Sequence, residues 1–215
     1  MRHGETILNR YNRMQGWSDA LLTEEGKTSL EQTRQALKNV PFSAVYTSDL
    51  SRTVETAKII LAQNQQTDPN IEITKLPAFR EEYFGSLEGL DAMSIWNDMA
   101  IFAKEHFDEA TMTDNERVRR QVDAFHALDP EHEAEDFLSF WTRVEQGLIK
   151  VTQRHRESDQ NVLIVSHGMT IRNMLHELIP EFSLNTFLDK GSVSIVRYQD
   201  GHYHLDSFNQ LDDFD

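Results

Sequence analysis

A run of apolar residues that passes directly into a helical pattern is the feature that most limits how this chain can fold. Residues 162–165 read Val-Leu-Ile-Val, and apolar residues recur from Ile171 at spacings of three and four until Pro180. The first pattern predicts a buried strand and the second an amphipathic helix that ends before the proline. A buried strand followed at once by a helix is typical of an α/β fold with a largely parallel sheet.

The rest of the chain repeats this alternation. Further strands are predicted at 43–46, 71–76 and 193–198, with an edge strand at 202–205. A helix is predicted to begin near Thr23, with Leu30, Leu37 and Val40 on its buried side. A second is predicted to begin near 48–51 and to bury Val54, Ala57 and Leu61. A third is predicted to begin at Phe137 and to bury Trp141, Val144, Leu148 and Val151. We therefore expect one domain over residues 1–215, an α/β three-layer sandwich whose mainly parallel central sheet is flanked by helices.

The span from about residue 90 to residue 130 has helical patterns and no strand candidate. We expect a helical insertion there, over the C-terminal ends of the strands. Its residues Met93, Trp96 and Met99 are interpreted as core, with the lining of a substrate pocket as the alternative. Its basic residues Arg117, Arg119 and Arg120 form either a solvated or ion-paired face or a second anchor for an anionic substrate.

Charge and composition exclude several classes of function. The chain has 21 Lys and Arg against 36 Asp and Glu, a net charge of −15, so nucleic acids and anionic membranes are not expected partners. The lack of cysteine excludes disulfides, thiolate metal sites and a cysteine nucleophile. No apolar run approaches the roughly 18 to 20 residues of a membrane span, and the first residues hold no apolar signal segment, which makes a cytoplasmic location the expectation. Oligomeric state is open, with a homodimer as one alternative.

Two predicted strand ends carry unusual polar residues. Ser166-His167-Gly168 follows the strand at 162–165, and the strand at 43–46 leads into a helix whose first turn holds Arg52. Ligands of open α/β sheets bind outside the carboxyl ends of the strands, where helix N-termini offer free N–H groups and a positive dipole end. Both junctions therefore suit a bound phosphate.

A third motif, Arg2-His3-Gly4, stands at the start of the chain. Together with residues 48–52, Glu81 and residues 165–168, in that order, it resembles the histidine phosphatase superfamily, which includes the cofactor-dependent phosphoglycerate mutases. The resemblance extends from Arg2 to about Leu175 and includes Asn9, residues 15–19, residues 22–26 and residues 85–89.

The resemblance implies that a phosphoryl group passes through a phosphohistidine without a metal or other cofactor. His3 is then the nucleophile, because a neutral imidazole nitrogen attacks phosphorus near pH 7 without a separate base. Arg2, Arg52 and His167 are expected to surround the phosphate with donors, and His167 to be protonated when phosphate is bound. The candidate substrate-binding residues are Thr6, Asn9, Gln15, Gly16, Glu82 and Gly168.

The resemblance also implies an acid that protonates the leaving alkoxide. Glu81 fits this role, and a bound phosphate should raise its pKa and keep it protonated near neutral pH. In the second half of the reaction Glu81 would deprotonate the attacking water. Glu82 is the rival carboxylate, but the spacing to Gly85 favours Glu81.

Departures from the mutase pattern favour a phosphatase. Glu82 stands where mutases have an arginine, and Met169 where they have an asparagine. A carboxylate beside the substrate would repel a phosphoglycerate. We therefore expect a metal-independent phosphomonoester phosphatase that acts on a small phosphorylated metabolite. The alternatives are mutase-type phosphoryl transfer, which is an isomerase activity, and a non-catalytic protein that binds a phosphorylated ligand.

One feature conflicts with the resemblance. In the family the Arg-His-Gly motif ends a central strand, whereas only Met1 precedes Arg2 in this sequence. Either the sequence is trimmed or its start is internal, or the strand is missing. A missing strand predicts unpaired backbone groups, a mobile His3, weak stability and poor activity.

Overall fold

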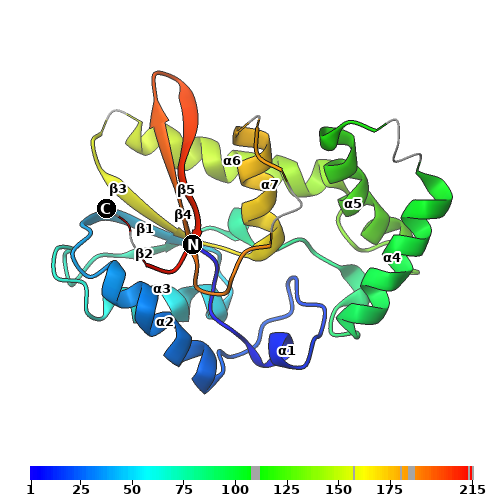
Figure 1. Cartoon of the computed structure of the whole chain (residues 1–215), viewed down its shortest axis with the longest axis horizontal. Helices are drawn as coiled ribbons and strands as arrows, with labels where there is room; N and C mark the ends of the chain where they lie inside the picture. The colour runs from blue at the N-terminus through cyan, green and yellow to red at the C-terminus, as the bar shows by residue number, and fades with distance from the viewer. Residues whose placement is uncertain (108–111, 157, 180, 184–186, 213, 215) are drawn as a thin grey trace.

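The computed structural model describes residues 1–107, 112–156, 158–179, 181–183, 187–212 and 214. Its centre is a sheet of three parallel strands in the order β2-β1-β3 (Figure 1). The strands are β1 (Phe42–Thr47), β2 (Ile73–Lys75) and β3 (Asn161–Val165). Strand β1 lies in the middle, because its Tyr46 pairs with Thr74 on one side and with Ile164 on the other.

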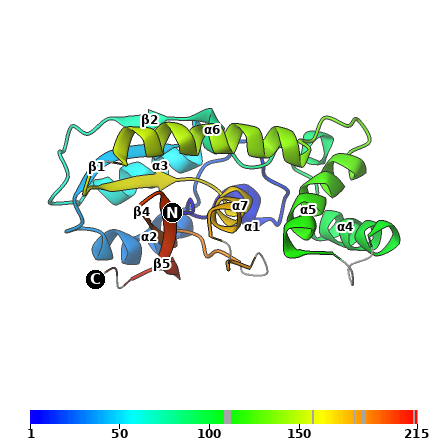
Figure 2. The ribbon, with the colours of Figure 1, turned by 90° about the horizontal axis from the view of Figure 1, so that it is seen from above.

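Helices cover both faces of this sheet. Val45 of β1 and Leu163 of β3 pack against α2 (Glu24–Ala36) and α3 (Ser51–Leu61). Tyr46 and its neighbour Ile164 point the other way, toward α6 (Phe137–His155) and α7 (Gly168–Leu178). Seen from above, α6 and α2 lie on opposite sides of the strands (Figure 2). Successive strand residues face opposite sides, so this alternation produces the predicted three-layer α/β arrangement.

Local signals explain where the helices begin. The Thr23 side chain accepts a hydrogen bond from the N–H of Gly26, and Glu24 and Glu25 lie in the first turn of α2, at the positive end of its dipole. Asp136 caps α6 in the same way, by accepting from the N–H of Ser139. Both helices thus start within one residue of the predicted positions.

The buried face of α3 differs from the prediction. Arg52, Thr53, Thr56, Ala57 and Ile60 are buried, whereas Val54 and Leu61 are only partly buried. The apolar pattern alone places Val54 and Leu61 inside. The helix is instead rotated so that the charged side chain of Arg52 points into the protein, toward the site described below.

The remaining strands form a separate antiparallel hairpin, β4 (Val193–Gln199) and β5 (His202–Gln210). Strand β5 is longer than the predicted edge strand, and β2 is shorter than the predicted strand at 71–76. Short helical turns connect the larger elements: α1 (Ile7–Arg10), η1 (Pro77–Phe79) and η2 (Gly85–Leu87). None of the helices in the described ranges is long and apolar enough to cross a membrane.

The helical insertion is formed by α4 (Ala92–His106) and α5 (Asp114–Leu128), and the residues between them, 108–111, lie outside the described ranges. Both helices lie at one end of the molecule, beyond α7 (Figure 1). Trp96 and Met99 pack against a core that contains Phe125, as predicted, but Met93 is 66% exposed. The core interpretation is therefore wrong for Met93.

The first residues of the chain are supported by the sheet. The N–H of Ser166, just after β3, donates to the carbonyl of Met1 at 3.0 Å, and the N–H of Arg2 donates to Ser192 at 2.9 Å. His3 donates to Ser166 and accepts from Gly191. The expectation of unpaired backbone is therefore wrong, because these first residues bond to the segment that follows β3 and to the segment that precedes β4. The mobility of His3 stays a prediction.

Candidate active site

His3 lies at the carboxyl end of the parallel sheet and is only 4% exposed. Its Nδ1 is 2.7 Å from the carbonyl oxygen of Gly4, and this contact assigns the ring proton to Nδ1 and leaves Nε2 with a free lone pair. Burial lowers the pKa of His3 well below its ordinary value, and the charges of Arg52 and Arg2 lower it further. His3 is therefore a neutral imidazole with an available nitrogen.

Arg2 presents an unused donor next to His3. Its Nη1 donates to the carbonyl of Leu188, but its Nε is buried and has no hydrogen-bond partner among the described residues. The guanidinium lies against Gly168, where an added Cβ would be 3.4 Å from Nε. A buried N–H without an acceptor costs about 1–3 kcal/mol. An anion bound here would remove that cost.

Arg52 is fully buried and largely engaged by the protein. Its Nη2 donates to Gly16 at 2.6 Å, its Nη1 to Ser18 at 2.9 Å and its Nε to Nδ1 of His167 at 3.2 Å. Three of the five guanidinium N–H groups are thus bound to the protein. The guanidinium of Arg52 can therefore offer a phosphate its positive charge and at most two N–H groups, fewer than the sequence predicts.

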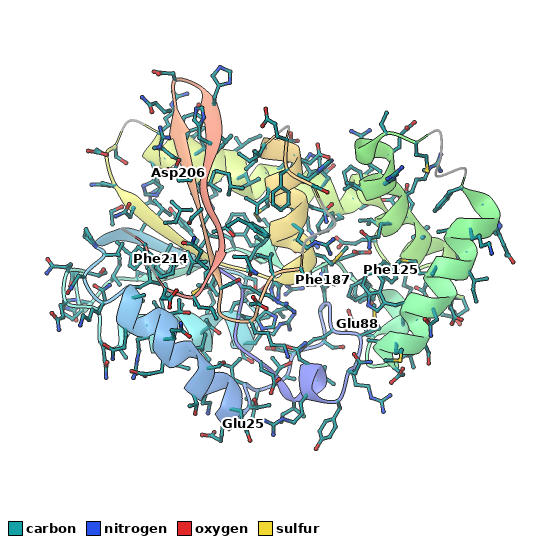
Figure 3. All side chains as sticks on the ribbon, in the orientation of Figure 1. Glu25, Glu88, Phe125, Phe187, Asp206 and Phe214 are labelled. Carbon is teal, nitrogen blue, oxygen red and sulfur yellow. The ribbon has the colours of Figure 1, made fainter. Side chains whose placement is uncertain are left out.

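The loop that surrounds Arg52 depends on a glycine and a carboxylate. A Cβ at Gly16 would lie 2.0 Å from the carbonyl oxygen of Glu82, so only glycine fits there. The carboxylate of Glu88 accepts from the N–H groups of Gly16, Trp17 and Ser18 at 2.7–3.1 Å. Figure 3 labels Glu88 in the region between α1 and α4. Both backbone polar groups of Gly16 are therefore taken by the protein.

His167 is buried and neutral in this structure. Because Nδ1 accepts from Arg52, the proton is on Nε2, which lies 2.9 Å from the hydroxyl of Ser48. Burial, followed by the charge of Arg52, lowers the pKa of His167 well below its ordinary value. Its ring centroid is 5.1 Å from that of His3. The structure thus brings the two predicted histidines together, and protonation of His167 in a phosphate complex stays a prediction.

Glu81 joins the same site from the segment that follows β2. Its carboxylate accepts from the N–H groups of Met169 and Thr170 at 3.0 and 2.9 Å and from the Thr170 hydroxyl at 2.9 Å. These donors lie in the first turn of α7, whose N-cap residue, His167, makes no capping bond with its side chain. Glu81 therefore caps α7, which places its carboxylate next to His167.

Glu82, the rival carboxyl, is buried next to Glu81. Its side chain is fully buried, and both of its oxygens lack a hydrogen-bond partner among the described residues. Burial, followed by the charges of Glu81 and Glu135, raises its pKa well above the ordinary value. A neutral Glu82 would not repel a phosphoglycerate, and its contact with a substrate stays a prediction.

Three other predicted substrate-binding residues form a network with one another. Thr6 caps α1 and is fully buried, and its hydroxyl donates to Oε1 of Gln15 at 2.6 Å. The side-chain amide of Asn9 donates to the same oxygen at 3.2 Å. In this structure the three side chains shape the loop after the Arg-His-Gly motif, and contact with a substrate stays a prediction.

Sequence reasoning missed Arg172, which lies in α7 one helical turn beyond the motif at 166–168. It is partly buried and close enough to Glu81 and Arg2 for their charges to act on it. Its Cζ is 5.7 Å from the ring centroid of Phe187, which is 84% exposed (Figure 3). The spacing of four residues after Gly168 on a predicted helix is the signal that could have placed Arg172 near the site.

The predicted basic cluster of the insertion contacts aromatic rings. Arg119 lies over Phe137 at 5.3 Å and Arg120 over Phe107 at 5.5 Å, and both are exposed. Within the described ranges, no group of three or more His, Cys, Asp or Glu side chains could hold a metal ion.

A neutral histidine, buried arginines and a carboxylate therefore meet at the carboxyl ends of parallel strands, and this fold and site define an α/β enzyme that handles phosphoryl groups. The family model of the histidine phosphatase superfamily (branch 1) matches residues 1–211. The chain belongs to this superfamily.

The similar proteins include relatives named as mutases and a solved structure of the same fold described as a putative phosphatase. The 2,3-bisphosphoglycerate-dependent phosphoglycerate mutase of Bartonella henselae is 30% identical over 183 residues, which cover 83% of this chain and 79% of the relative. The structure of phosphoglycerate mutase from Bacillus anthracis is similar with a TM-score of 0.85 at 30% identity, over 98% of this chain and 91% of that one. An Escherichia coli structure described as a putative alpha-ribazole-5'-P phosphatase shares the fold, with a TM-score of 0.72 at 22% identity over 99% of this chain and 95% of that one.

Proposed function

We propose that the protein is a metal-independent phosphomonoester phosphatase that acts on a small phosphorylated metabolite through a phosphohistidine. One observation carries the proposal: His3 is buried, neutral and protonated on Nδ1, so that Nε2 is free to attack. The unpartnered Nε of Arg2 and the charge of Arg52 lie close enough to receive the phosphoryl oxygens.

The reaction has two halves. Nε2 of His3 attacks phosphorus, the bond from phosphorus to the ester oxygen breaks, and Glu81 gives a proton to the leaving alkoxide. Water then attacks the phosphohistidine, Glu81 takes a proton from that water, and the bond from phosphorus to nitrogen breaks. Inorganic phosphate leaves, and both side chains return to their starting states.

The arginines provide the electrostatic part of this mechanism. The transferred phosphoryl group spreads negative charge over three oxygens, and fixed cations and donors stabilise that charge without reorganisation. Arg2 and Arg52 supply two such groups. A bound dianion favours a proton on Nδ1 of His167, because the anion offsets the electrostatic effect of Arg52 on its ring, and this proton replaces the bond from Nε of Arg52.

Phosphoglycerate-mutase-type phosphoryl transfer is the second candidate. It is supported by the names of the relatives and by Arg172, a further cation that can hold the carboxylate of a phosphorylated acid. We favour the hydrolase because Met169 stands at the position of the mutase asparagine and because Arg119 and Arg120 lie against aromatic rings.

The test is the release of inorganic phosphate from sugar phosphates, phosphoglycolate, 3-phosphoglycerate and p-nitrophenyl phosphate with EDTA present. We compare the wild type with His3→Ala and with His202→Ala, which removes an exposed histidine of β5. Release that continues in EDTA, survives in His202→Ala and is lost in His3→Ala supports the proposal. Interconversion of phosphoglycerates with little free phosphate identifies a mutase, and the absence of any turnover favours a protein that only binds its ligand.

A further inference from the structure

Arg143 of α6 holds the backbone that carries Glu81. Its Nη1 donates to the carbonyl oxygens of Ala78 and Arg80 at 3.0 and 2.9 Å, and its Nη2 donates to the carbonyl oxygen of Glu81 at 2.7 Å. One side chain thus binds three carbonyls within four residues. We call residues 78–83 the acid loop.

Glu135 holds Arg143 and also grips the acid loop directly. Its two carboxylate oxygens accept from Nε and Nη2 of Arg143, both at 2.6 Å. One of these oxygens also accepts from the N–H of Tyr83, and the N–H of Glu135 donates to the carbonyl of Tyr83, both at 2.9 Å. The Arg143 and Glu135 side chains are only 18% and 12% exposed, so water competes weakly for these charged bonds.

Other contacts also support the acid loop: the Ser166 and Thr170 hydroxyls donate to the carbonyls of Phe79 and Arg80, both at 2.9 Å, and the Arg80 side chain binds Asp49. Around Glu81 and Glu82 the contacts are fewer. Glu82 makes no side-chain hydrogen bond among the described residues, and the carbonyl of Glu81 has one further donor, Nε1 of Trp17 at 2.9 Å. Beyond the loop, the Glu81 carboxylate reaches the first turn of α7. The position of that carboxylate therefore depends in part on where Arg143 holds the backbone beneath it.

We infer that the Arg143–Glu135 ion pair is a positioning device that sets the geometry of proton transfer from Glu81 to the leaving group. The inference rests on the proposed function, in which Glu81 is the acid. Arg143 and Glu135 act through the acid loop and are positioning residues. Proton transfer requires the acid within hydrogen-bond reach of the leaving oxygen, and a misplacement of about 1 Å can cost about 10²-fold in rate.

The leaving group supplies a readout that a general loss of structure does not produce. An alkoxide leaves only if it is protonated, whereas p-nitrophenolate is a stable anion and leaves without an acid. We measure kcat and KM for an alkyl phosphate and for p-nitrophenyl phosphate in the wild type, Arg143→Met and Arg143→Lys. The control is Arg197→Met, which breaks an exposed ion pair with Asp206 in the β4–β5 hairpin.

We expect Arg143→Met to lose about 10²-fold in kcat on the alkyl ester, at the low end of a general acid's contribution, and less than about tenfold on the p-nitrophenyl ester. Arg143→Lys keeps the charge but not the planar guanidinium, so its kcat on the alkyl ester should lie between that of the wild type and that of Arg143→Met. Arg197→Met should match the wild type on both esters. An equal loss on both esters, or no loss, would overturn the inference.

A structural readout separates this inference from the proposed function. In crystals of Arg143→Met we expect the Glu81 carboxylate to leave the N–H groups of Met169 and Thr170. A Glu81 that stays in place overturns the inference, whether or not the wild type hydrolyses either ester. If the wild type hydrolyses neither, the proposed function fails and this readout still decides the role of Arg143. Should Arg143→Met not fold, Glu135→Gln removes the ion pair with little change in shape, and the same two measurements apply.

Discussion

Arg52 donates from Nε to Nδ1 of His167 at 3.2 Å, and this bond fixes both the orientation and the tautomer of a buried histidine. The same guanidinium binds the carbonyls of Gly16 and Ser18, so one side chain joins α3, the loop at 16–18 and the start of α7. Arg52 thus organises the site as well as contributing charge to it.

Arg52→Lys should therefore lower kcat by roughly 10²–10³-fold, the cost of losing one preorganised donor to the transition state. A lysine keeps the charge but cannot reach all three acceptors. Steady-state kinetics on the best ester of the panel measures the effect, with Arg197→Lys as the matched control on the exposed hairpin. Activity close to that of the wild type in Arg52→Lys would contradict this account.

The buried histidines should make folding stability depend on pH. Burial and nearby arginines lower the pKa values of His3 and His167, so the unfolded chain takes up protons first as the pH falls. The protein should lose stability below about pH 6.5, by up to about 1.4 kcal/mol per pH unit for each histidine. Urea unfolding between pH 7 and pH 5 gives the free energy of unfolding as a function of pH. For His167→Gln the slope of this function should be smaller than that of the wild type by the contribution of one histidine. An unchanged slope would show that the folded protein accepts the proton.

Glu82 should have the opposite effect. Burial raises its pKa above the ordinary value, so the wild type loses stability as the pH rises above that value and the unfolded carboxyl ionises first. Glu82→Gln removes this dependence. Above about pH 4.5, the free energy of unfolding of the variant should increase relative to that of the wild type by up to about 1.4 kcal/mol per pH unit. This increase should end where the pH reaches the raised pKa of Glu82. Thermal or urea unfolding from pH 4.5 to pH 8 measures it, and a constant difference across this range would count against a buried neutral carboxyl.

Arg172 should select for phosphorylated acids. A charge-assisted hydrogen bond contributes about 1.5–3 kcal/mol, so Arg172→Met should lower kcat/KM for a phosphorylated carboxylic acid roughly 10- to 100-fold. For the phosphate ester of an uncharged alcohol, kcat/KM of this variant should fall much less. Arg197→Met, in the exposed β4–β5 hairpin, is the control. Arg119→Met tests the insertion as an anion anchor. Equal losses on the two substrates in Arg172→Met would exclude the carboxylate contact.

Local sequence patterns predicted much of the fold. The strand at 162–165, the cap at Thr23 and the helix from Phe137 appear in the structure within a residue or two, because hydrophobic periodicity and capping act over short distances. The predicted buried face of α3 was confirmed for Ala57 but not for Val54 and Leu61, which are only partly buried. Apolar periodicity assigns charged residues to the outside, and it cannot foresee that carbonyl groups from a distant loop will surround Arg52.

The sequence by itself determined the family, the parallel sheet and which histidines, arginines and carboxylate belong together, because these follow from residue types in a fixed order. The tertiary structure decided what each of them does in the resting protein. It placed Glu82 inside, gave His167 a neutral tautomer and bound three of the five N–H groups of Arg52 to the protein. It also added Arg172 and Arg143 to the surroundings of Glu81. Burial, hydrogen bonding and charge around a side chain arise from segments that are far apart in the chain, and only the folded structure brings those segments together.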